Sequence, residues 1–156
     1  MQHPYFECIT LVERLHRQFL DVLKIELERA GIQDINNVQS LILYNIGQDE
    51  LTVGELTARG YYLGSNVSYN LKKMVENGYL VQERSVHDRR SIRVKLSEKG
   101  HAIRTLMNEV FERHIANVEN SGLDLEKLKD VNDALKNLER FLTGQVGYSP
   151  LNQVPA

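Results

Sequence analysis

Apolar residues recur at helical spacing along most of this chain, and only residues 80–96 change to a period of two. Within that stretch, residues 92–96 alternate apolar with basic side chains, which predicts a half-buried β-strand. Residues 80–84 can form its partner strand, and the polar, basic residues 85–91 suit an exposed hairpin tip. The pattern therefore predicts a mainly α fold with one small β-hairpin.

Glycine stops and N-cap residues indicate where the first two helices of the chain begin and end. Residues 5–30 form the first predicted helix, which Gly31 terminates. A second helix ends at Gly47 in the same way. The candidates for its N-cap are Asp34, Asn36 and Asn37.

The middle of the chain predicts two further helices after a β-prone segment. Residues 51–53 favour a short strand, and residues 54–59 favour one or two helical turns. A better defined helix then runs to Gly78, with its N-cap expected at Gly64 or Ser65. Its apolar stripe consists of Val67, Leu71 and Met74.

Two long helices are predicted after the hairpin. Ser97 caps the first, which continues to about Asn120, and residues 121–122 break the chain. The second shows apolar residues at alternating spacings of three and four and ends at Gly144. Such a heptad-like seam requires a partner helix. It consists of Leu128, Val131, Leu135, Leu138 and Leu142.

Composition fits an ordinary domain that needs no metal or disulfide. The 156 residues are 42% hydrophobic and 26% charged, and no apolar run approaches the ~20 residues that cross a bilayer. Met1–Ile9 contain no secretory signal, and the lone cysteine, Cys8, agrees with a reducing compartment, so we expect a cytoplasmic protein without a membrane partner. The five histidines lack ligand-like spacing, and phosphate loops, nucleophile elbows and dinucleotide fingerprints are missing, which argues against a metal, a cofactor and an enzyme.

The charge is unevenly distributed along the chain. Residues 51–104 hold ten Lys or Arg against five Asp or Glu, a charge of +5, whereas the remainder carries −7. A basic middle between acidic ends can attract a polyanion on one face. The alternative is a chance distribution on a solvated surface.

Four short segments occur in a characteristic order along the middle of the chain. They are Glu-Leu-Thr at 55–57, Glu-Asn-Gly-Tyr-Leu-Val at 76–81, Asp-Arg-Arg at 88–90 and Val-Lys-Leu-Ser-Glu-Lys-Gly at 94–100. Together with the helices around them, these segments resemble the MarR family of winged helix-turn-helix regulators.

The resemblance implies a mainly α fold with a small β-hairpin wing, within a single domain at residues 1–143. Residues 33–100 would form the winged-helix lobe that binds DNA, residues 1–31 and 101–143 the dimerisation helices, and residues 144–156 a flexible tail. One stretch departs from the family pattern, because Gly60 comes one position early and Leu63 stands where a Ser or Thr cap is expected.

The polar face of the helix that ends at Gly78 is the predicted DNA-binding surface. A helix fits the major groove, where its exposed N-terminal residues reach base edges, and no acid interrupts this face before Glu76. Lys72 and Lys73 lie farther along and suit phosphate contacts. The alternative is an ordinary solvated face. The base-contacting candidates are Ser65, Asn66, Ser68 and Tyr69.

The resemblance identifies the hairpin tip as a DNA-binding wing. It implies that Arg90 enters the minor groove, where narrow A·T tracts concentrate negative potential. It also implies that Asp88 braces a nearby arginine, with phosphate contacts added by Arg84, His87 and Arg89. The alternative is a hairpin tip that is merely soluble.

Two further properties depend on the resemblance. A peroxide-sensing branch of the family keeps a reactive cysteine near the place of Cys8, but its tyrosines early in the second helix are replaced here by residues 35–38, so a structural Cys8 is the preferred interpretation. Other members bind small, often aromatic, molecules in a crevice. Its lining here would be Tyr5, His16, Phe19, Leu41 and Tyr44, which would equally make an ordinary core.

The sequence therefore predicts a dimeric, sequence-specific transcription regulator that responds to a small-molecule effector. Its partners would be a second copy of the chain and double-stranded DNA with an inverted-repeat operator. Two alternatives remain, a thiol-based redox sensor that uses Cys8 and a winged-helix module for protein or RNA contact. Basic residues on both the helix and the hairpin favour DNA over the last of these.

Overall fold

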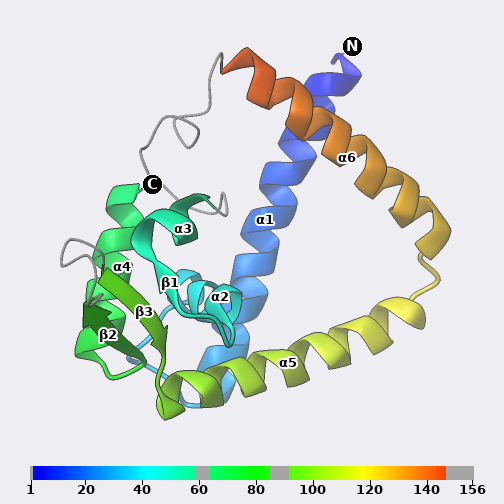
Figure 1. Ribbon diagram of the computed structural model, residues 1–156. Coiled ribbons are helices and arrows are strands. Elements are labelled where there is room, and N and C mark those ends of the chain that lie inside the picture. The colour runs from blue at the N-terminus through cyan, green and yellow to red at the C-terminus, as the bar shows by residue number, and fades with distance from the viewer. Residues whose placement is uncertain (1, 59–63, 85–91, 147–156) are drawn as a thin grey trace. The chain divides into compact units, whose positions relative to one another are not determined.

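The computed structural model describes residues 2–58, 64–84 and 92–146. The chain divides into two units, Met1–Asn108 and Glu109–Ala156, which are described separately. Figure 1 shows the elements in chain order: α1 (Pro4–Arg29), α2 (Asn37–Ile46), β1 (Leu51–Thr52), α3 (Val53–Ala58), α4 (Gly64–Glu76), β2 (Leu80–Arg84), β3 (Ile92–Leu96), α5 (Glu98–Glu119) and α6 (Leu125–Gln145).

Glycines end α1 and α4 where the sequence predicts. Gly31 and Gly78 have φ values of 73° and 83°, in the left-handed region that glycine adopts without a steric penalty. After α4, the N–H of Gly78 donates to the Val75 carbonyl at 3.1 Å, and the N–H of Tyr79 donates to the Met74 carbonyl at 2.9 Å. This pair of bonds is a Schellman motif, which satisfies carbonyls that the helix end leaves open.

Asn36, one of the three predicted N-cap candidates, caps α2. Its Oδ1 accepts the N–H of Gln39 at 2.8 Å, and its own N–H donates to Gln39 Oε1 at 3.1 Å, which completes a capping box. Next to it, Asn37 Nδ2 donates to the Leu20 carbonyl at 3.0 Å and ties α2 to α1. The helix ends at the predicted Gly47, whose φ is 61°.

The three strands form an antiparallel sheet in the order β1-β3-β2 (Figure 1). Leu80 of β2 lies opposite Leu96 of β3, and Leu51 of β1 lies opposite Val94. Val94 and Leu96 are buried while their basic neighbours are exposed, so the predicted hairpin and its half-buried alternation are confirmed. β1 is one residue shorter than predicted because Val53 already belongs to α3.

The core of the first unit forms where α2, α3 and α4 pack with the sheet. Each contributes side chains that are nearly inaccessible to solvent, and this arrangement determines which face of α4 turns outward. A mainly helical chain with a small sheet confirms the predicted fold class. The most deeply buried of these side chains are Ile42, Leu43, Ile46, Leu56, Val67, Met74 and Val94.

The first turn of α5 is joined to the chain that leaves α4. Ser97 caps α5 as predicted, because its Oγ accepts the N–H of Gly100 at 3.1 Å. The same hydroxyl donates to the Gly78 carbonyl at 2.6 Å, and the Ser97 N–H donates to the Tyr79 carbonyl at 3.0 Å. Two bonds from one residue therefore hold the start of α5 against the chain that follows α4.

The second unit contains the rest of α5 and the whole of α6. The predicted break is confirmed at Gly122, whose φ is 85°, and Asp124 caps α6. Gly144 does not end α6, which continues to Gln145, because the backbone at Gly144 does not take the left-handed conformation of a helix stop. The tail predicted from residue 144 thus begins too early, and residues 147–156 lie outside the described part. None of the described helices combines the length and apolarity needed to cross a membrane.

Candidate nucleic-acid interface

The face of α4 opposite its buried stripe carries the predicted base-contacting residues. Because Val67, Leu71 and Met74 are buried, the residues on the opposite side of the helix turn outward. The side chain of Tyr69 is 61% exposed, and Asn66 and Ser68 are also exposed. The helix already begins at Gly64, so the expected N-cap at Gly64 or Ser65 is wrong by at least one residue. Residues 59–63 and the side chain of Ser65 lie outside the described part.

The two lysines of α4 differ in their surroundings. Lys73 Nζ lies 3.6 Å from Glu76 Oε2 and 6.0 Å from the centre of the Tyr69 ring, so part of its charge is already compensated. Lys72 is exposed and has no ion pair with any described residue. Lys72 is therefore the cation on this face that is better placed to meet a phosphate.

The base of the hairpin is described, but its tip is not. Arg84 is exposed at the end of β2, opposite Ile92 of β3. Glu83 Oε1 and Lys95 Nζ form a cross-strand ion pair at 3.1 Å, which links the two strands near the tip. The other predicted wing residues, His87, Asp88, Arg89 and Arg90, lie outside the described residues.

A buried amide connects α2 to α4, and sequence reasoning missed it. The side chain of Gln39 is only 7% exposed, and its Nε2 donates to Asn70 Oδ1 on α4 at 3.1 Å. Its Oε1 is the acceptor of the capping box with Asn36. The Asn-x-x-Gln spacing was the available signal for the box, but the sequence contains no signal for the contact with α4.

Asp34, in the loop before α2, accepts hydrogen bonds from residues that follow α4 and from the start of α5. Its carboxylate accepts from Tyr79 Oη and, at 2.7 Å, from Lys99 Nζ, while its backbone carbonyl accepts from Asn77 Nδ2 at 2.8 Å. Lys99 also donates to the Asn77 carbonyl at 2.9 Å and lies 4.2 Å from the centre of the Tyr79 ring. Asp34 thus holds three partners from beyond the α1–α2 loop, two through its carboxylate and one through its backbone carbonyl.

The ionisation of this cluster follows from its hydrogen bonds. The bond from Lys99, and then the bond from Tyr79, lowers the pKa of Asp34 below its usual range. Burial, and then the bond to Asp34, raises the pKa of Tyr79. Asp34 is therefore charged and Tyr79 protonated at neutral pH, as this arrangement of donors and acceptor requires.

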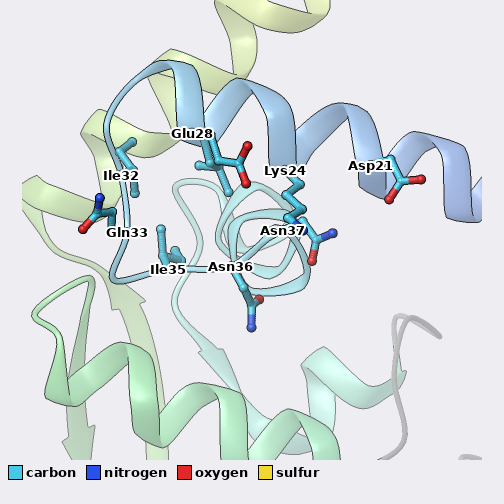
Figure 2. A pocket seen from close by; sticks show the side chains of 9 residues that line it. Asp21, Lys24, Glu28, Ile32, Gln33, Ile35, Asn36 and Asn37 are labelled. Atoms are coloured by element: carbon cyan, nitrogen blue, oxygen red, sulfur yellow. The ribbon is translucent and has the colours of Figure 1, made fainter.

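A cavity of about 630 Å³ opens between α1 and the start of α2 (Figure 2). Asp21, Lys24 and Glu28 project from α1 on one side, and Ile35 and Asn36 belong to the loop on the other. Its volume falls within the range of small-molecule sites. None of the five residues predicted for an effector crevice lines it.

The predicted crevice residues lie on α1 and α2. Tyr5, Leu41 and Tyr44 are half-buried, whereas His16 and Phe19 are exposed. Their role in effector binding stays a prediction. Cys8 is half-buried on α1, and among the described residues no group of three or more His, Cys, Asp or Glu side chains is arranged to hold a metal ion.

The helix pair α3–α4 followed by the β2–β3 hairpin defines a winged helix-turn-helix protein. Residues 33–91 match the MarR family, and the chain is 36% identical over 135 residues to the "Exopolysaccharide II synthesis transcriptional activator ExpG" of Rhizobium meliloti, covering 86% of this chain and 70% of that protein. The chain belongs to the MarR family of transcriptional regulators. The predicted family is thus confirmed, as is the prediction that the protein is not an enzyme.

Solved structures share this fold. FabT of Streptococcus pneumoniae, solved in complex with DNA, has a TM-score of 0.70 at 20% identity and covers 90% of this chain and 99% of its own. MarR of Staphylococcus aureus, solved in complex with salicylate and kanamycin, has a TM-score of 0.71 at 21% identity and covers 90% of this chain and 93% of its own. At these identities the likeness establishes the fold.

Proposed function

We propose that this DNA-binding regulator acts as a homodimer in the cytoplasm, recognises an inverted-repeat operator through α4 and the hairpin, and changes its DNA affinity when it binds a small molecule. The observation that carries the proposal is the outward face of α4. That face presents Asn66, Ser68 and Tyr69 at its N-terminal half and, farther along, Lys72, which forms no ion pair with any residue that the structure describes. The solved FabT complex with DNA supports the same use of this fold.

The side chains of α4 have separate tasks in this proposal. An asparagine amide can pair bidentately with adenine, and a serine hydroxyl can donate to or accept from either strand, so Asn66 and Ser68 select bases. Tyr69 offers a large apolar ring that suits the methyl group of thymine. Lys72 contacts a phosphate, which holds the register without specifying sequence.

Salt-dependent DNA binding separates these tasks. We expect Lys72→Ala to weaken binding to all DNA and to lower the slope of log affinity against log salt by about one for each bound copy. Asn66→Ala should instead relax the preference at one base pair per half-site, by about 1–3 kcal/mol of discrimination. Lys136→Ala, at an exposed lysine of α6, is the control that should change neither. An unchanged salt slope for Lys72→Ala would contradict the assignment.

The wing is proposed from the family pattern of residues 88–90. Arg90→Ala should weaken operator binding and relax the preference for A·T pairs beneath the wing. Asp88→Ala removes a negative charge, so charge counting predicts tighter binding. If Asp88 braces an arginine, the variant instead frees the wing and binding weakens. Tighter binding by Asp88→Ala would therefore contradict the proposed wing.

The homodimer is supported by apolar side chains left exposed on the terminal helices. On α1, Leu15 is 62% exposed, and on α6, Val131 is 48% exposed within a heptad-like seam that contains no fully buried residue. Exposed apolar surfaces of this kind mark interaction sites. A two-fold dimer would place its half-site centres about one helical turn, roughly 10 bp, apart. Footprints on direct repeats or on a single half-site would contradict this arrangement.

The effector response is supported by the salicylate and kanamycin complex of the S. aureus protein. Two places on this chain can be tested: the crevice predicted at Tyr5, His16, Phe19, Leu41 and Tyr44, and the cavity beside Asn36. Salicylate at 100 times its Kd should stabilise the fold by about 2.7 kcal/mol. The proposal also requires that the same addition change operator affinity. Stabilisation without any change in DNA affinity would contradict it.

A further inference from the structure

Gln39 uses both ends of its side-chain amide. Its Oε1 accepts the N–H of Asn36 at 3.1 Å within the capping box, and its Nε2 donates to Asn70 Oδ1 at 3.1 Å. A glutamate at this position would complete a capping box equally well, but only the amide supplies a donor for α4. Since the side chain is buried, that donor must be satisfied, and Asn70 satisfies it.

The bond to Asn70 adds a directional constraint that the apolar stripe of α4 lacks. Burial of Val67, Leu71 and Met74 is favourable over a range of small rotations of the helix, because the hydrophobic effect has no preferred direction. A hydrogen bond weakens steeply when its angle changes. Asn70 immediately follows the exposed Tyr69, so its bond to Gln39 fixes the rotation of α4 close to the residues proposed to contact bases.

A second contact holds α4 at its C-terminal end. Asp34 accepts from Tyr79 and Lys99 through its carboxylate and from Asn77 through its backbone carbonyl. Asp34, in the loop before α2, and Gln39, in the first turn of α2, therefore contact the turn that follows α4 and the middle of α4 respectively. We call these two residues the Asp34–Gln39 clamp.

We propose that the Asp34–Gln39 clamp positions the recognition helix, so that residues without any contact to DNA set its sequence preference. The inference rests on the proposed role of α4 in base contact.

The test is a double-mutant cycle on specificity with Gln39→Ala, Asn70→Ala and the double variant. The operator is the sequence that wild-type protein selects from random DNA, and the ratio of its affinity to that of a scrambled sequence is measured at fixed salt. Each single variant should lower this ratio about fivefold, the equivalent of one hydrogen bond, and the double variant should lower it no further. The salt slope should not change, because no phosphate contact is lost.

Asn36→Ala is the matched control. It removes the side-chain cap of α2 but keeps the backbone N–H that donates to Gln39. Its melting temperature should fall by about 2–4 °C with an unchanged specificity ratio. Additive effects of Gln39→Ala and Asn70→Ala would show that specificity does not depend on the bond between them. An equal loss of specificity in Asn36→Ala would show that Gln39 acts only through stability, and either result would overturn the proposal.

Hydrogen exchange of α4 separates this inference from the proposed function. Gln39→Ala should speed amide exchange in residues 66–74 more than Asn36→Ala does, without any DNA present. If wild-type protein does not discriminate between DNA sequences, the proposed function fails, and the exchange data still decide whether the clamp holds α4. Equal exchange of α4 in the two variants would overturn the clamp.

Discussion

Replacing Gly100 with alanine should destabilise the winged-helix unit, although alanine is the better helix former. Gly100 lies in the first turn of α5, where a Cβ would fall 2.3 Å from the Tyr79 carbonyl oxygen and 3.3 Å from Leu96 Cβ. That carbonyl is not free to move, because it accepts the N–H of Ser97 at 3.0 Å. The added methyl group must therefore push α5 away from the chain that follows α4.

The size of the effect can be worked from this geometry. Overpacking costs about 1–3 kcal/mol and occasionally more, and a contact this short against backbone belongs at the upper end of that range. The higher helix propensity of alanine returns at most about 1 kcal/mol. The net loss is about 2 kcal/mol, which lowers the melting temperature of a domain of this size by about 4–8 °C.

Gly144→Ala is the matched control, since it makes the same chemical change inside α6. No atom of the described residues lies within 4 Å of the Cβ that would be added there, and we expect stabilisation by at most about 0.5–1 kcal/mol. Both variants can be compared by thermal and urea unfolding followed by circular dichroism. If Gly100→Ala melts at or above the wild-type temperature while Gly144→Ala is stabilised, the packing argument is refuted.

Three further predictions concern the dimer, the thiol and the acid limit of stability. Leu135→Asp should give monomers in sedimentation that bind DNA weakly, whereas a stable wild-type monomer at micromolar concentration would contradict the dimer. Cys8→Ser should bind DNA normally, and hydroperoxide should not release wild-type protein; release that depends on Cys8 would establish a thiol sensor instead. The pKa of Asp34 is lowered in the folded state, so its contribution is present above about pH 4 and is lost as pH falls further. Wild-type protein should therefore exceed Asp34→Asn in urea stability at pH 7, and the difference should shrink as pH falls below about 4; a difference that stays constant down to pH 3 would contradict this.

The elements were predictable because their signals are local. The stripe at Val67, Leu71 and Met74, the alternation at residues 92–96 and the stops at Gly31 and Gly78 each involve neighbours within one turn or one strand. Backbone geometry links such neighbours directly, so sequence spacing is enough to recognise them. The prediction that α6 ends at Gly144 was wrong. A glycine near the end of a periodic pattern can stop a helix, but nothing in the sequence forces it to do so.

In the candidate site, too, the local features were predictable from the sequence and the contacts between helices were not. Asn66, Ser68, Tyr69 and Lys72 were predictable as an outward face, because the buried stripe of α4 determines what lies opposite to it. The partners of Gln39 were not predictable, since Asn70 comes from a different helix and its register depends on packing. Their contact exists only because the core places α2 against α4.

Substitutions on the outward face of α4 and substitutions in the Asp34–Gln39 clamp should change the DNA sequence preference of the protein in different ways. Residues on the outward face of α4 alter recognition by changing which group meets a base, whereas Gln39 and Asp34 would alter it by changing where every such group lies. A substitution at Asn66 should therefore affect one base pair per half-site, and a substitution at Gln39 should reduce discrimination at several positions together. Selection of DNA by the two variants distinguishes these patterns directly. A Gln39→Ala protein whose preference changes at only one base pair would mean that its amide acts on a single neighbouring side chain and not on the orientation of the helix.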